Sequence, residues 1–122
     1  MKKIEAIIRH ERLQDVQDAL DELGVSGLTV SEVVGCGRQK GYTEQYRGVQ
    51  ANISLLPKIK VESVVPSDLA DGAVSAIVEA ARTGNVGDGR VFVYDVVEAI
   101  RIRTGESGED TVRHEEPVGW GH

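Results

Sequence analysis

The chain has 122 residues and a mass of 13.2 kDa, which fits a single domain. Apolar residues make up 40% of it and aromatic residues only 4%, so the core has to be built mainly from Val, Ile, Leu and Ala. A formal net charge of −6 argues against a general nucleic-acid-binding protein, and a single cysteine excludes a disulfide within the chain.

The first part of the chain predicts a strand, a helix and a second strand. Residues 2–9 are rich in isoleucine and predict a strand. Residues 11–23 carry apolar side chains at helical spacing, and Gly24 directly after them is a natural helix end. Residues 28–34 are enriched in β-branched side chains and predict the second strand.

A long polar segment follows the second strand. From 35 to about 54 it is rich in glycine and shows neither helical nor strand periodicity. Loops beyond about 12–15 residues are uncommon inside compact domains and are usually functional or disordered. We therefore predict a long mobile loop at about 37–55 as the first sign of function.

The second part of the chain predicts a strand, a helix and a strand. Residues 57–65 alternate between apolar and charged side chains. Ser67 is the expected cap of a helix that runs to about Arg82. A glycine-rich turn at 83–89 then leads into a strand at 90–97.

The C-terminal part of the chain is less regular. Residues 99–103 alternate again and allow a short extra strand, whereas residues 107–122 form a polar tail that we expect to be flexible. The order of the main elements predicts an α+β, ferredoxin-like βαββαβ sandwich with two helices on one face of an antiparallel sheet. Apolar residues point both ways along the strands, so packing against other subunits would cover the second face.

The sequence contains no pattern typical of a catalytic centre. Its three histidines form no cluster with metal-ligand spacing, and no nucleophile elbow is present. Cys36 has no base nearby in the sequence, so a small packed or partly exposed thiol is the simpler interpretation.

Three basic segments, two of them rich in glycine, indicate an anion site. Residues 35–41 combine glycines with Arg38 and Lys40, and residues 84–90 have the outer glycine spacing of a phosphate loop without its Lys-Ser/Thr. The Arg101-Ile102-Arg103 segment would place two guanidinium groups on one face of an extended chain. Taken singly, each also fits a tight turn or a charged edge strand, but together they suggest a polyphosphate site.

Several of these segments together resemble the PII signal-transduction family. The matching blocks, which share the spacing of the family without gaps, are Gly37-Arg38-Gln39-Lys40-Gly41, Tyr46-Arg47-Gly48, Leu56-Pro57-Lys58, Thr83-Gly84, Gly87-Asp88-Gly89 and Arg101-Ile102-Arg103-Thr104-Gly105-Glu106. The resemblance covers residues 1–106. It implies a homotrimer with nucleotide sites in the clefts between subunits.

The resemblance assigns ATP or ADP to these clefts. The nucleotide-binding residues that it implies are Thr29, Gly35, Gly37, Arg38, Gln39, Glu62, Val64, Gly87, Asp88, Gly89, Arg90, Arg101 and Arg103. The glycines with Arg38, Asp88 and Arg90 would cradle the phosphates, and Arg101 and Arg103 would reach across from the neighbouring subunit. Arg90 stands where the family more often has lysine, which keeps the charge but changes the donor geometry.

The resemblance also implies 2-oxoglutarate as an effector, bound through Mg²⁺ and ATP. The residues implied for this effector are Gln39, Lys40, Gly41, Lys58 and Gly87. The side-chain oxygen of Gln39 would join the Mg²⁺ shell, and Lys58 would pair with the distal carboxylate. ADP lacks the γ-phosphate that completes this metal site, so the sensor would couple energy status to carbon and nitrogen status.

Partners would read the conformation of the long loop. In the family, Arg47 at the loop tip contacts an ammonium transporter, so we expect that transporter or nitrogen-assimilation enzymes as partners. The tyrosine and serine that relatives modify are replaced here by Ala51 and Val49, which predicts control by effectors alone. We expect a cytoplasmic, non-enzymatic protein that meets a membrane only through a transporter.

Three alternatives remain open. Within the family, the chain could regulate nitrogenase or bicarbonate uptake instead. From another class, it could be a weak nucleotide hydrolase with Asp88 as the formal candidate for a general base.

Overall fold

A computed structural model describes residues 1–25, 27–38 and 53–113 of the chain. The elements along the chain are β1 (Lys2–Ile8), the 3-10 helix η1 (His10–Arg12), α1 (Leu13–Glu22), β2 (Thr29–Arg38), β3 (Ile53–Val65), α2 (Ser67–Ala81), β4 (Arg90–Asp95) and the 3-10 helix η2 (Glu109–Val112). None of these helices is both long and apolar enough to cross a membrane.

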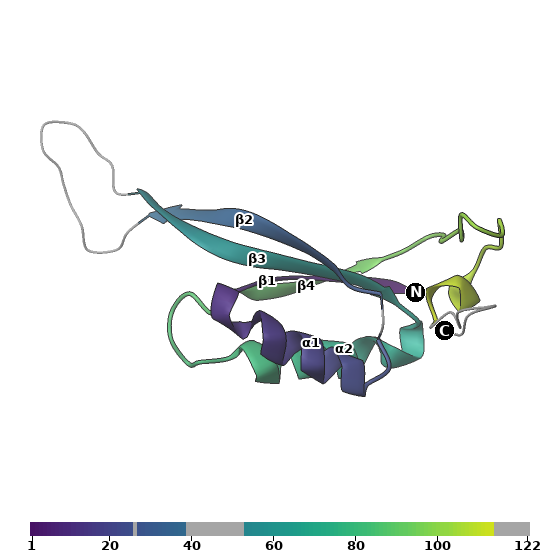
Figure 1. Cartoon of the computed structure of the whole chain (residues 1–122), viewed down its shortest axis with the longest axis horizontal. Helices are drawn as coiled ribbons and strands as arrows, with labels where there is room; N and C mark the ends of the chain where they lie inside the picture. The colour runs from purple at the N-terminus through teal and green to yellow at the C-terminus, as the bar shows by residue number, and fades with distance from the viewer. Residues whose placement is uncertain (26, 39–52, 114–122) are drawn as a thin grey trace, which may run out of the picture.

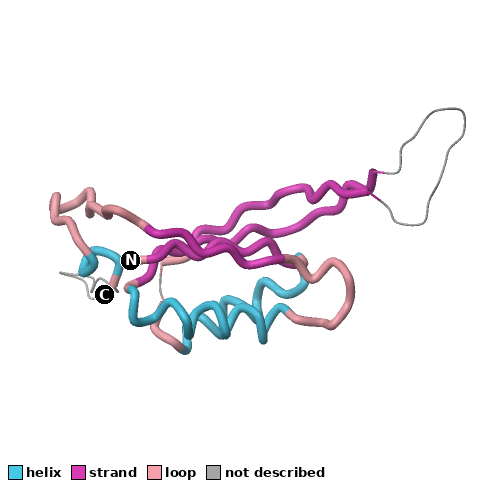
Figure 2. Tube along the Cα trace, turned by 180° about the vertical axis from the view of Figure 1, so that it is seen from behind, coloured by secondary structure: helices cyan, strands magenta, loops and turns pink. Residues whose placement is uncertain are grey.

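The strands form one antiparallel sheet in the order β2-β3-β1-β4. Both α-helices lie side by side on one face of this sheet (Figures 1 and 2). The βαββαβ order and the two-layer arrangement confirm the predicted ferredoxin-like α+β fold.

The core lies between the sheet and the helices. Alternate residues of β1 and β3 point towards α1 and α2, and small side chains on α2 let the helix approach the sheet closely. The buried apolar residues are Ile4, Ala6, Ile8, Val16, Leu20, Val25, Ile59, Val61, Val65, Ala70, Ala73, Ile77 and Ala81. This aliphatic core agrees with the composition, which left few aromatic side chains to fill it.

The second face of the sheet has no helix over it in the described part of the chain (Figure 1). Phe92 and Tyr94 on this face are 42% and 46% exposed. They lie opposite Glu5 and Lys3 of β1, and the ammonium group of Lys3 is 5.4 Å from the ring centre of Tyr94. Half-exposed aromatic side chains on an open sheet face suit contact with another protein surface.

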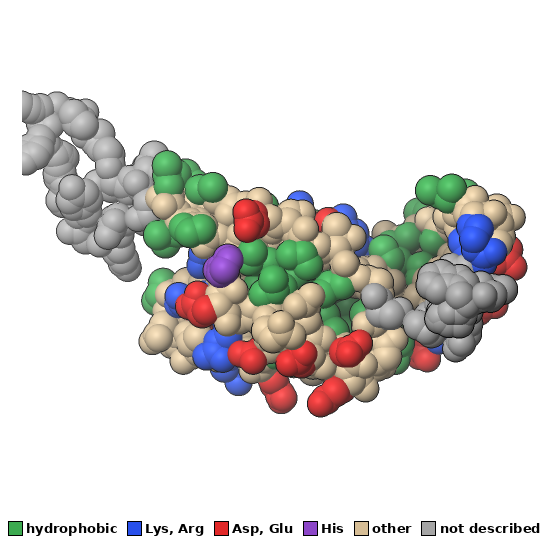
Figure 3. Space-filling view, viewed as in Figure 1, with side chains coloured by type: hydrophobic (Ala, Val, Ile, Leu, Met, Phe, Trp, Pro, Cys, Tyr) green, Lys and Arg blue, Asp and Glu red, His purple; other side chains and the backbone are tan. Residues whose placement is uncertain are grey.

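β2 and β3 are longer than the sequence indicated. They stay paired up to the Arg38–Ile53 pair, so their ends project beyond the body as an arm (Figure 1). Apolar side chains gather on this arm, where Val34, Leu55 and Leu56 are all more than half exposed (Figure 3). The ends of the predicted loop, 37–38 and 53–55, are therefore strand, and residues 39–52 lie outside the described residues.

The segment after β4 differs from the prediction. The expected strand at 99–103 does not form, because the chain turns back and pairs Ile100 with Ser107. The backbone N–H of Gly105 donates to the carbonyl oxygen of Arg101 (2.7 Å), which closes this turn. Residues 107–113 then lie near the chain N-terminus and the start of α2 (Figure 1). Tail flexibility stays a prediction for residues 114–122, which lie outside the described residues.

A residue far along the chain caps the start of α2. The helix begins at Ser67 itself, and no side chain of the preceding residue caps it. The backbone N–H of Ser67 instead donates to the carboxylate of Glu109 (2.6 Å). The prediction that Ser67 caps this helix is therefore wrong, because a carboxylate 42 residues away takes that role.

Candidate functional site

The glycine loop, residues 83–89, joins α2 to β4 and is organised around the carboxylate of Asp88. One carboxylate oxygen accepts hydrogen bonds from the backbone N–H groups of Thr83 and Gly84 (both 2.8 Å). The other accepts from the hydroxyl of Thr83 and from Nε of Arg9 (2.9 Å). These donors hold the pKa of Asp88 well below its usual range, with the Thr83 hydroxyl as the largest cause.

Arg9 ties this loop to the end of β1. Besides its ion pair with Asp88, its Nη2 donates to the carbonyl oxygen of Val86 (2.8 Å). One guanidinium group thus fixes two points of the loop with its planar fork of donors. This role of Arg9 could not be predicted, because Asp88 is 79 residues away and no local pattern links the two residues.

Gly87 and Gly89 meet conditions that a larger residue cannot meet. Their φ angles are +103° and +104°, in the left-handed region that favours glycine. A Cβ atom on Gly89 would lie 1.7 Å from the carbonyl oxygen of Ile7. A Cβ atom on Gly87 would lie 3.2 Å from Nη2 of Arg9 and 3.8 Å from Nζ of Lys58.

Lys58 joins the glycine loop from β3. Its ammonium group donates to the carbonyl oxygen of Gly87 (2.6 Å), and its stem lies against Gly35, where a Cβ atom would be 3.2 Å from its Cγ. Arg90 follows the loop as the first residue of β4, paired with Ile7. The structure thus brings Gly35, Lys58, Gly87 and Arg90 to one end of the sheet.

Other predicted residues lie on the arm or outside the described residues. Gly37 and Arg38 form the last two pairs of β2 with Ser54 and Ile53. The predicted site residues Gln39, Lys40, Gly41 and Arg47 fall within 39–52 and are not described.

A second concave region lies at the start of β2. Thr29 lies opposite Glu62, and both line an open cleft of about 800 Å³ together with Val64. Nζ of Lys3 lies 2.9 Å from the Glu62 carboxylate. Hydrogen bonding within this pair lowers the pKa of Glu62 and raises that of Lys3.

Arg101 and Arg103 belong to the segment after β4. Nη1 of Arg101 lies 2.6 Å from the Glu106 carboxylate, and its Nη2 donates to the carbonyl oxygen of Asp110 (3.3 Å). The glycine loop and this segment lie at opposite ends of the molecule (Figures 1 and 2). The six residues of β4, about 20 Å of extended chain, run between them. Within one chain, the predicted site residues therefore form two separate groups.

Asp88, the formal candidate for a general base, is already engaged within the glycine loop. The carboxylate of Asp88 is engaged by donors on both oxygens and its pKa is lowered, which suits an anchor better than a general base.

We expect Asp88→Asn to loosen the glycine loop and to change how stability depends on pH. Because the folded-state pKa of Asp88 is depressed, its contribution is present above the unfolded value near 3.9 and is lost as the pH falls towards the folded pKa. The variant should unfold a few degrees lower at about pH 7 and lose less stability on acidification. Melting curves between about pH 7 and pH 3 measure this.

Asp15→Asn is the matched control, because Asp15 pairs with Arg12 in an exposed contact on the helix surface (3.2 Å). Melting temperatures for Asp88→Asn that follow those of Asp15→Asn at every pH would contradict the anchoring role.

The sequence is similar to proteins of one family along most of its length. The model of the family described as nitrogen regulatory protein P-II matches residues 1–106. Nitrogen regulatory protein P-II of Haemophilus influenzae is 54% identical over 112 residues, which are 92% of this chain and all of the relative. The P-II protein of Rhodobacter capsulatus is 55% identical and P-II 1 of Escherichia coli K12 is 53% identical, with the same coverage.

Proposed function

Because this chain belongs to the nitrogen regulatory protein P-II family and is thus a signal-transduction regulator, we propose that it senses ATP or ADP together with 2-oxoglutarate. One observation carries the proposal: Arg9 and Asp88 hold the glycine loop in place, and Lys58 contacts it at Gly87. Backbone N–H groups in such a loop, close to cationic side chains, suit an anionic ligand.

The two separated groups of residues support an assembly in which each nucleotide site is shared. The glycine loop of one subunit, with Arg38 and Arg90, would hold the phosphates. The open cleft at Thr29 and Glu62 is proposed to take the nucleotide base and is named the base cleft for this reason. The base cleft of the neighbour, with Arg101 and Arg103, would supply the remaining contacts. The uncovered sheet face with Phe92 and Tyr94 gives subunits an apolar surface through which to pack. A homotrimer, as the family resemblance implies, would form three such sites.

The effector is proposed to bind beside the phosphates. Lys58 already lies at Gly87, so its ammonium group is close enough to the loop to pair with a carboxylate of 2-oxoglutarate. The side-chain oxygen of Gln39 is the chain's proposed ligand for the Mg²⁺ ion, with Lys40 and Gly41 nearby in the sequence. Mg²⁺ would supply a shared electrostatic link between ATP and the organic acid.

The output is proposed to be the conformation of the segment at 39–52, which begins directly after the arm. Ligands bound beside Gly37 and Arg38 would bias that segment, and a partner would read it. An ammonium transporter contacted by Arg47, or nitrogen-assimilation enzymes, are the proposed targets. Regulation of nitrogenase or of bicarbonate uptake is the alternative within the same family.

Titration calorimetry tests the sensing mechanism. We expect ATP and ADP to bind the unmodified chain, and 2-oxoglutarate to bind only when both ATP and Mg²⁺ are present. Lys58→Ala should weaken the binding of 2-oxoglutarate by about 30-fold or more, which is the usual scale for losing one partner of a charge-assisted contact. The same variant should change ATP affinity much less. Equal binding of 2-oxoglutarate without nucleotide would contradict the proposal.

A further inference from the structure

The C-terminal strap, residues 107–113, is a fixed part of the fold although it lies beyond the residues that the family model matches. Glu109 caps α2 by accepting from the N–H of Ser67 (2.6 Å), and its carboxylate lies 3.4 Å from the α-amino nitrogen of Met1. The backbone N–H of Gly108 donates to the carbonyl oxygen of Ala99 (3.0 Å). The strap is therefore anchored to α2, to the chain N-terminus and to the segment after β4.

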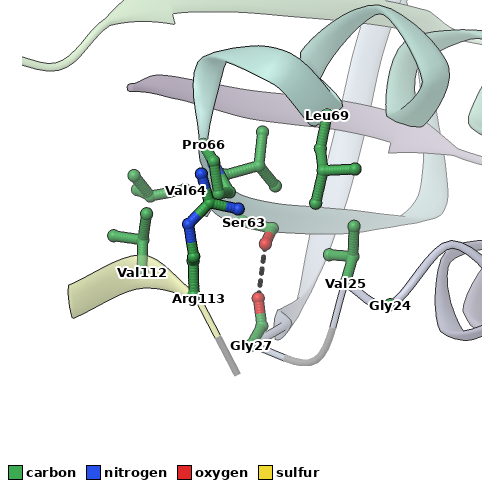
Figure 4. A pocket seen from close by; sticks show the side chains of 10 residues that line it. Gly24, Val25, Gly27, Ser63, Val64, Pro66, Leu69, Val112 and Arg113 are labelled. Carbon is green, nitrogen blue, oxygen red and sulfur yellow. Dashed lines mark hydrogen bonds between the residues drawn. The ribbon is translucent and has the colours of Figure 1, made fainter. Parts of the chain in front are cut away.

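The anchored strap forms one wall of the base cleft. Thr111, Val112 and Arg113 line the 800 Å³ cleft that Thr29 and Glu62 line from the sheet. Val112 and Arg113 also line an adjoining pocket of about 110 Å³ under the start of α2. In Figure 4 the guanidinium group of Arg113 lies beside the labelled Val64 and Pro66, between the strap and the sheet.

Charged side chains around the cleft already have partners of opposite sign. Lys3 is paired with Glu62. The guanidinium group of Arg113 lies 3.3 Å from the Asp68 carboxylate through Nη2 and 3.7 Å from the Asp110 carboxylate through Nε. These ion pairs engage Nη2 and Nε of the guanidinium group. Such a balanced site suits a neutral, planar ligand group better than a phosphate.

On the basis of the proposed nucleotide site, we infer that the strap is the third wall of the base-binding half-site and that Arg113 stacks its guanidinium plane on the purine base. Val112 adds apolar contact, and Thr111, whose hydroxyl donates to the carbonyl oxygen of Gly108 (2.6 Å), helps to hold this wall in shape. The strap then contributes to the affinity for ATP and ADP equally, because it touches the part that the two nucleotides share. The phosphates would be held outside this cleft, between the glycine loop of the adjoining subunit and Arg101 and Arg103.

Calorimetry with ATP and ADP on full-length variants tests this inference. Arg113→Ala should weaken both nucleotides by about five- to tenfold, the range of stacking contacts made by arginine. Arg113→Lys, which keeps the charge but lacks the plane, should stay weakened by at least about threefold. Arg12→Ala is the matched control, because it also removes a partly exposed, ion-paired arginine but lies away from the cleft.

A second variant tests the anchor without replacing a residue that lines the cleft. Glu109→Gln should loosen the strap and weaken ATP and ADP by the same factor, about twofold or more. Arg113→Ala affinities within twofold of the unmodified chain, complete rescue by Arg113→Lys, or a loss for ATP far above that for ADP would each overturn the inference. Failure of the unmodified chain to bind either nucleotide would overturn the proposed function, and the inference with it.

Discussion

Replacing Gly89 with alanine is expected to abolish nucleotide binding and to destabilise the fold. The added Cβ atom would lie 1.7 Å from the carbonyl oxygen of Ile7, which is backbone and cannot rotate away. The φ angle of +104° adds strain of about 1–3 kcal/mol for a residue with a side chain. The loop and the start of β4 must therefore move away from β1, and Arg90 moves with them. Urea unfolding and ATP calorimetry measure the two effects.

Gly84→Ala is the control for backbone strain alone. Gly84 has a φ angle of +92°, but a Cβ atom there would meet no atom within 4 Å. This variant should lose only about 1 kcal/mol of stability and keep most of its nucleotide affinity. If the two alanine variants bound ATP equally, the close approach of Gly89 to Ile7 would have no functional meaning.

Much of the fold could be predicted because local signals agree with the tertiary structure. The helical spacing of Val16 and Leu20, and the alternation around Ile59 and Val61, mark the residues that the core buries. The ends of β2 and β3 were less predictable. Their outer pairs continue the ladder between the two strands, but the apolar residues Val34, Leu55 and Leu56 there are exposed and do not alternate with polar residues as those of the core strands do.

Contacts between distant segments were the least predictable. Nothing near Ser67 indicates that Glu109 caps α2, and nothing near Arg9 indicates that Asp88 is its partner 79 residues away. The alternation of Arg101 and Arg103 suggested an extended strand, but the pairing of Ile100 with Ser107 turns the chain back instead. Periodicity reports which face of an element is buried, and it does not report which loops meet.

The same limit applies to the candidate site. Glycine-rich turns and clustered arginines indicated an anion site, and the structure places Gly35, Lys58, Gly87 and Arg90 at one end of the sheet. It leaves the segment after β4, to which Arg101 and Arg103 belong, at the other end of the molecule (Figure 1). The sequence indicates which residues belong to the site, but only the fold shows that they lie far apart within one chain. The family resemblance already implied sites between subunits, and this separation gives that expectation a physical reason.

Removal of both guanidinium groups in Arg101→Ala/Arg103→Ala is expected to weaken ATP by about 100-fold or more, because two charge-assisted contacts to phosphate are lost together. This loss alone would not show whether the arginines bind the nucleotide at the glycine loop of their own subunit or of a neighbour. Mixing these chains with Gly89→Ala chains distinguishes the two cases, because each variant damages a different group of residues. Calorimetry measures the ATP binding of the mixed assemblies, and light scattering measures their size.

If sites form between subunits, random mixing in equal amounts restores about a quarter of them, since an intact glycine loop then meets intact arginines from a neighbour. If each chain builds its own site, no combination of the two damaged chains restores any. The control sample contains Gly89→Ala chains only and should show no recovery of ATP binding. Recovered ATP binding in the mixture therefore requires arginines and glycine loop to come from different subunits, and its absence would contradict the shared site.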